Sequence, residues 1–164
     1  MSISYHPIGV IHSPFNSIEN MPIQPTAAVG ICGTVEVFAE HVDGLKDLDG
    51  FSHLILLYHF HRAGKVRLTV TPFLDTEPRG LFATRAPSRP NPIGLSVVSL
   101  LSIEGNILRI ENVDIVDGTP LLDIKPYVPE FDQYERVKPG WLASARKRLR
   151  ETTADGRFGE EDSA

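Results

Sequence analysis

Apolar and polar residues alternate along much of this chain, and this period of two limits the folds it can adopt. The alternation is clear in residues 31–37, 66–71 and 108–111. Because successive side chains of a strand point to opposite faces, it predicts half-buried antiparallel strands. The segment SHLILLYHF, residues 52–60, is apolar on both faces and predicts the central strand. Helical patterns do not alternate with these strands, so the sequence predicts a mainly β fold.

Turn residues define two further elements. Gly105 and Asn106 separate apolar segments at 95–104 and 107–113, which predicts a hairpin with a two-residue turn. Residues 39–50 contain internal glycines, so we expect no more than a helical turn there.

A single longer helix is predicted near the C-terminus, over residues 139–152. Its apolar stripe would consist of Trp141, Leu142, Ala145 and Leu149. Its basic residues, either an RNA-facing patch or an ordinary solvated surface, are Arg146, Lys147, Arg148 and Arg150. We expect this short helix to pack on the sheet and residues 153–164 to form a disordered tail.

Length and composition restrict the cellular setting. The 164 residues suit one compact domain, and no apolar run approaches the roughly 20 residues that span a bilayer. The first residues do not resemble a signal peptide, and the single Cys32 cannot form an internal disulfide. We therefore expect a cytoplasmic protein, no membrane contact, and a buried structural thiol at Cys32.

The net charge of -5 argues mildly against a nucleic-acid partner, but the charges are unevenly distributed. Residues 62–89 contain six basic and two acidic side chains, whereas residues 152–164 are predominantly acidic. A phosphate-bearing partner therefore remains physically reasonable.

The most unusual segment is GLFATRAPSRPNPIGLS, residues 80–96. Its three prolines restrict the backbone of a loop that contains Arg85, Arg89 and Asn91. A stiff loop with arginines could bind a carboxylate or phosphate group with little loss of entropy. Composition alone equally allows a spacer whose arginines face water.

Two other groups of polar residues could form sites. Asp117 begins the turn sequence DGTP, where a carboxylate could bind a ligand or simply close an Asx-turn on its own backbone. His53, His59 and His61 have odd positions along one predicted strand and would share a face. Without a neighbouring Cys or carboxylate ligand, core or pocket histidines are favoured over a metal site, and we expect no metal.

Five strings in this order resemble the TsaA-like, or TrmO, family. They are GVIHSP (9–14), PIQP (22–25), GLKDLDGFSHLILLYHFH (44–61), FATRAPSRPNPIGLS (82–96) and DIVDGTPLLDIKPYVP (114–129). The resemblance covers about residues 5–130. It implies a compact antiparallel β-barrel domain over residues 1–138, S-adenosyl-L-methionine as cofactor, a homodimer, and N6 methylation of threonylcarbamoyladenosine next to the tRNA anticodon.

The same strings imply the residues of the site. The implied cofactor contacts are Pro22, Ile23, Gln24, His61, Arg62, Arg85, Leu95, Asp117, Gly118, Thr119 and Pro120. The residues assigned to substrate or RNA are Arg89, Asn91 and Lys125. Asp117 and His61 are the candidate catalytic bases, since a ureido-type N6–H must lose its proton on methylation.

Two alternative functions remain open from the sequence. One is a module that binds S-adenosylmethionine as a sensed ligand, and the other is a methyltransferase with a different acceptor. Cofactor binding without transfer to tRNA would favour either of them.

Overall fold

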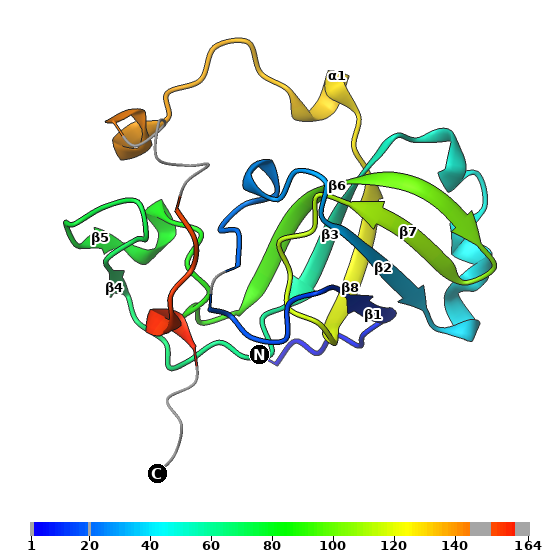
Figure 1. Cartoon of the computed structure of the whole chain (residues 1–164), viewed down its shortest axis with the longest axis horizontal. Helices are drawn as coiled ribbons and strands as arrows, with labels where there is room; N and C mark the ends of the chain where they lie inside the picture. The colour runs from blue at the N-terminus through cyan, green and yellow to red at the C-terminus, as the bar shows by residue number, and fades with distance from the viewer. Residues whose placement is uncertain (1, 20, 145–151, 160–164) are drawn as a thin grey trace.

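The structure is a computed structural model that describes residues 2–19, 21–144 and 152–159. Its main body is a closed barrel of six antiparallel strands in the order β1-β2-β7-β6-β3-β8 (Figure 1). The strands are β1 (Gly9–His12), β2 (Cys32–Val37), β3 (His53–His59), β6 (Ile93–Glu104), β7 (Ile107–Glu111) and β8 (Thr119–Pro126). The predicted mainly β, barrel-like fold class is confirmed.

Strand β3 lies between β6 and β8, as expected for the central segment. Its burial nevertheless alternates. Leu54, Leu56 and Tyr58 point into the barrel core, whereas Ile55 and Leu57 are only half-buried on the outer face. A closed barrel encloses only its inner side, so the apolar outer face of β3 stays partly exposed.

The predicted hairpin joins β6 to β7. Glu104 pairs with Ile107, and Gly105 adopts the positive φ of 63° in the turn between them. Glycine meets this requirement without steric cost, which explains why the turn could be predicted.

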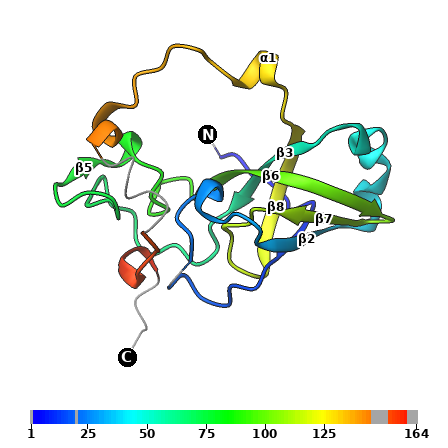
Figure 2. The ribbon, with the colours of Figure 1, turned by 45° about the horizontal axis from the view of Figure 1, so that its top comes forward.

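A second, smaller lobe lies beside the barrel (Figures 1 and 2). It contains the two-stranded sheet of β4 (Thr69–Val70) and β5 (Arg79–Gly80), followed by the 3-10 helix η4 (Leu81–Ala83). The strand predicted over 66–71 is therefore reduced to two residues. The partner strand β5 has only two residues, because η4 begins directly after it. Val66 and Leu68 remain exposed.

Short helices connect these elements. They are η1 (Pro25–Ala27), η2 (Ala39–Leu45), η3 (Leu48–Gly50), α1 (Pro129–Asp132), η5 (Gly140–Ser144) and η7 (Gly156–Phe158). The helical turns expected at 39–50 are thus η2 and η3. Among the described residues, no helix is long and apolar enough to cross a membrane.

The C-terminal region differs from its prediction. The described part of the predicted helix is the 3-10 helix η5, while Ala145, Leu149 and the four bases lie outside the described residues. Residues 152–159 are not a free tail: Thr153 bridges to Pro22, and Ala154 and Phe158 are buried. Phe158 packs in the small lobe with Val70, Leu81 and Ala86, and this apolar burial holds the segment in place.

Candidate functional site

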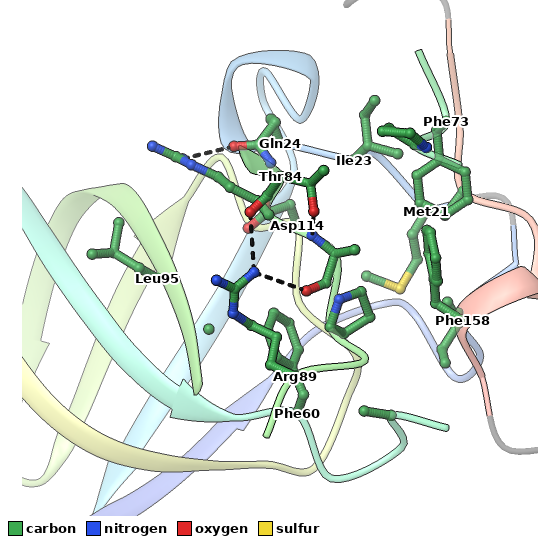
Figure 3. Close-up of a pocket in the computed structure, with 18 of the residues that line it drawn as sticks. Met21, Ile23, Gln24, Phe60, Phe73, Thr84, Arg89, Leu95, Asp114 and Phe158 are labelled. Atoms are coloured by element: carbon green, nitrogen blue, oxygen red, sulfur yellow. Dashed lines mark hydrogen bonds between the residues drawn. The ribbon is translucent and has the colours of Figure 1, made fainter. Parts of the chain in front are cut away.

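A cavity of about 830 Å³ lies between the end of the barrel and the small lobe. Its walls come from residues 21–26, the end of β3, the loop 82–89, the start of β6 and the segment before β8. Figure 3 shows Met21, Phe73 and Phe158 gathered on one side of the cavity, with Leu95 on the other. The cavity therefore joins segments that are distant in sequence.

The structure brings most of the predicted cofactor residues to this cavity. Those that line it are Pro22, Ile23, Gln24, His61, Arg62, Arg85, Leu95 and Thr119. Arg89, predicted to contact substrate, lines it as well. The predicted residues that do not line it are Asn91, Asp117, Gly118, Pro120 and Lys125.

The proline-rich loop forms one wall, and its two arginines have different environments. Arg85 Nη1 donates to Gln24 Oε1 at 2.9 Å and so connects the loop to the 22–24 segment. Arg89 Nη1 donates to the carbonyl oxygens of Thr84 (3.0 Å) and Ala86 (3.3 Å) within its own loop. Arg89 thus shapes the loop from inside, in addition to the rigidity that the prolines supply (Figure 3).

His61 and Arg62 follow β3 and enter the cavity from the barrel side. Thr119 Oγ1 donates its single proton to the Val116 carbonyl at 2.6 Å. In its 3.3 Å contact with His61 Nδ1 the hydroxyl must therefore accept, and the imidazole N–H donates. Arg62 Nη1 donates to the Asn16 carbonyl at 2.7 Å.

The three histidines do not form a cluster. His53 and His59 lie exposed on the outer face of β3, while His61 lies beyond the strand end and lines the cavity. Within the described part of the chain, no three His, Cys, Asp or Glu side chains are arranged to hold a metal ion.

Cys32, expected to be buried, is exposed at the start of β2. The alternation of this strand turns Val35 and Val37 inward and Cys32 outward, which corrects the sequence prediction.

Asp117 lies outside the cavity lining. Its Oδ1 accepts hydrogen bonds from the Ser13 backbone N–H (3.1 Å) and contacts His12 Nδ1 (3.2 Å). Partial burial raises the pKa of Asp117, but the hydrogen bonds from Ser13 and His12 outweigh it and hold the pKa below its ordinary value. This carboxylate fixes the segment after β1, a position that sequence reasoning did not anticipate for it.

Sequence reasoning missed a polar group on the cavity wall. Asp114 lines the cavity, and its Oδ1 accepts a 2.6 Å hydrogen bond from Ser96 Oγ. Ser96 Oγ in turn lies 3.0 Å from the Tyr58 hydroxyl. Burial raises the pKa of Asp114 to about 6, although the Ser96 hydrogen bond acts in the opposite direction. The only signal in the sequence was a carboxylate between the apolar residues Val113 and Ile115.

Barrel and cavity together define the class of protein: a closed six-stranded antiparallel barrel with a ligand-sized cavity at its end, unrelated to doubly wound nucleotide-binding folds. A family model described as the tRNA-methyltransferase O N-terminal domain matches residues 10–133. The chain belongs to this TrmO family, which confirms the resemblance drawn from the sequence motifs.

Three similar proteins illustrate the relationship. A probable S-adenosyl-L-methionine-binding protein from Pyrococcus abyssi is 60% identical over 158 residues, which are 96% of this chain and 86% of that protein. The tRNA (adenine(37)-N6)-methyltransferase of Escherichia coli is 41% identical over 154 residues, 88% of this chain and 66% of its own length. The crystal structure of TrmO from Pseudomonas aeruginosa superposes with a TM-score of 0.73 at 40% identity, covering 86% of this chain and 63% of that one. This chain thus spans just under two thirds of both bacterial proteins.

Proposed function

We propose that this protein is an S-adenosylmethionine-dependent methyltransferase that modifies N6 of adenosine in tRNA, with threonylcarbamoyladenosine as the acceptor. The observation that carries the proposal is the convergence of eight predicted cofactor residues on one cavity. Its volume of about 830 Å³ lies within the range of sites for small ligands. The names of the Pyrococcus and Escherichia relatives support the cofactor and the acceptor class respectively.

The residues present suit the chemical groups of S-adenosylmethionine. Arg62 and Arg85 line the cavity and can pair with a methionine carboxylate. Phe60, Phe73 and Phe158 supply apolar and aromatic surface for an adenine ring. The cofactor would provide a methyl group on a sulfonium, and the protein would align the acceptor with it and exclude water.

Basic residues around the cavity support a tRNA partner. Lys65 and Arg85 belong to the basic 62–89 segment and are exposed, and Arg85 also lines the cavity. Lys125 makes a 2.7 Å ion pair with Asp123 on the outer face of β8. We keep Arg89, Asn91 and Lys125 as proposed contacts to substrate or RNA; Arg89 also holds the shape of its loop by its hydrogen bonds to Thr84 and Ala86. A tRNA-modifying role also supports a cytoplasmic location.

The test is nucleoside mass spectrometry of tRNA incubated with the purified protein and S-adenosylmethionine. We expect a mass gain of one methyl group on threonylcarbamoyladenosine and none on unmodified tRNA as control. Cofactor binding without any methyl gain would instead support the sensing module. Turnover of the cofactor with a small-molecule amine, but not with tRNA, would support the other acceptor.

We also propose a homodimer formed through the outer face of β3 and β6. Half-buried or exposed apolar residues form a continuous stripe there, consisting of Ile55, Leu57, Ile93, Leu95 and Val97. Ile93 and Leu95 also line the cavity, so a second copy on this stripe would adjoin both sites. Exposed contiguous apolar surface of this kind is typical of an interaction site.

Replacing Val97 with glutamate should convert the dimer to a monomer, because it places a charge within the apolar stripe, opposite Ile55. Light scattering or sedimentation velocity would measure the mass. Thr34→Glu, on the outer face of β2, is the matched control and should stay dimeric. A wild-type protein that is monomeric at all concentrations would contradict the dimer.

A further inference from the structure

The cavity wall contains several cationic side chains but a single acidic one. Its titratable or charged lining residues within the described chain are Tyr58, His61, Arg62, Arg85, Arg89 and Asp114. Asp114 is therefore the one carboxylate among the described residues that contact the cavity. Asp114 comes from the segment before β8. This segment meets the start of β6 at Ser96, beside Tyr58 near the end of β3.

A chain of hydrogen bonds holds this carboxylate in place. Ser96 Oγ donates its only proton to Asp114 Oδ1 at 2.6 Å, so Tyr58 must be the donor in its 3.0 Å contact with Ser96. Ser96 is 1% exposed and Tyr58 5% exposed, so water cannot readily replace either group. Burial raises the pKa of the Tyr58 hydroxyl, which keeps its proton in place. All donors in the chain are thus directed toward an ionised Asp114.

We propose that Asp114 is the proton acceptor in methyl transfer, with Ser96 and Tyr58 as residues that position it. This inference rests on the proposed methyltransferase function. As the acceptor nitrogen forms its bond to the methyl carbon, the carbon–sulfur bond breaks and its electron pair returns to sulfur, giving a neutral thioether. The acceptor N–H bond breaks as well, and its proton goes to the Asp114 carboxylate.

The electrostatic environment suits this role. Burial raises the pKa of Asp114 to about 6, so the group is mostly ionised at neutral pH yet more basic than an exposed carboxylate. Of the two bases considered from sequence, Asp117 fits less well, because it lies outside the cavity and its hydrogen bonds lower its pKa. The positive charge of Arg85 lowers the pKa of Asp114, but this effect is smaller than the increase caused by burial.

The decisive variant is Asp114→Asn, which keeps the shape and can still accept the Ser96 hydrogen bond. We expect kcat for methylation of threonylcarbamoylated tRNA to fall about 100-fold or more, the usual contribution of a general base. S-adenosylmethionine binding, measured by calorimetry, should change much less. The wild-type rate should decline as the pH falls below about 6, because Asp114 becomes protonated, and this decline should be lost in the variant.

Two variants control for charge and for the alternative base. Asp43→Asn removes an exposed carboxylate in η2, away from the cavity, and should leave the rate unchanged. Asp117→Asn should retain the decline at low pH. If Asp117→Asn abolishes this decline and Asp114→Asn does not, the proposal is wrong.

The positioning role of Ser96 has its own signature. Its hydrogen bond lowers the pKa of Asp114, so Ser96→Ala should raise that pKa and move the acid decline of the rate to higher pH. Tyr58→Phe, which leaves the Ser96 donor in place, should move it less. A merely structural role would lower the rate at every pH without moving the decline.

The outcomes separate this proposal from the function on which it rests. If the wild-type protein binds the cofactor but transfers no methyl group to tRNA, both the proposed function and the role of Asp114 as proton acceptor are wrong. Wild-type activity that persists in Asp114→Asn with an unchanged pH profile would overturn only the base assignment. A loss of cofactor affinity in Asp114→Asn with normal kcat at saturation would make Asp114 a binding residue and would also overturn it.

Discussion

Phe158→Ala is expected to destabilise the protein by about 3–5 kcal/mol, the range for truncating a buried phenylalanine. Phe158 is 4% exposed and packs edge-to-face on Phe73, with ring centroids 5.1 Å apart. It also contacts the small-lobe cluster of Val70, Leu81 and Ala86. Because its side chain lines the cavity, the loss should weaken S-adenosylmethionine binding as well. Urea unfolding and calorimetry would measure the two effects.

The chain offers a control of the same residue type. Phe131, in α1, is 74% exposed, so Phe131→Ala removes an equal side chain from solvent-exposed surface and should change stability little. If Phe158→Ala unfolds at the same urea concentration as the wild type, residues 152–159 do not belong to the cooperative unit. In that case their contacts with the small lobe contribute nothing to global stability.

The contrast between the barrel and this C-terminal segment shows what sequence patterns can predict. Strand β3 was predictable because a short apolar run is a local signal, and the turn at Gly105 because a positive φ is a local requirement. The docking of Phe158 was not, because it is a single aromatic residue in a polar segment without periodicity. Its neighbour Arg157 donates to the Thr71 carbonyl, 86 residues away, and no local pattern encodes such a contact.

The site was predictable to a different degree. Most of the residues that the family motifs implied line the cavity, Arg85 and His61 among them. The turn sequence at 117–120 drew attention to Asp117, whose carboxylate instead binds Ser13 and His12. Asp114 was missed because its place in the cavity wall depends on a contact with Ser96 of β6, 18 residues earlier in the chain. The 114–129 motif contains several polar residues, and contacts between distant segments of the barrel determine which of them faces the cavity.

Gly94→Ala is the second change with a large expected effect. Gly94 pairs with Tyr58 across β6 and β3, and the aromatic ring lies against the glycine backbone. A Cβ at this position would lie 2.5 and 2.8 Å from Cζ and Cδ2 of Tyr58, and closer still to Cε2. The buried ring must therefore move, and overpacking of this kind costs about 1–3 kcal/mol.

The displacement of Tyr58 in Gly94→Ala should also reach the site, because the Tyr58 hydroxyl donates to Ser96, which holds Asp114. We expect reduced stability in urea together with reduced methyl transfer. Gly80→Ala is the control, since a Cβ there meets no heavy atom within 4 Å, and both properties should remain close to wild type. A Gly94→Ala protein that is less stable but transfers methyl groups at the wild-type rate would show that the Tyr58 contact supports the fold alone. Equal losses in both variants would mean that the effect comes from glycine replacement in general, not from the close approach of Tyr58.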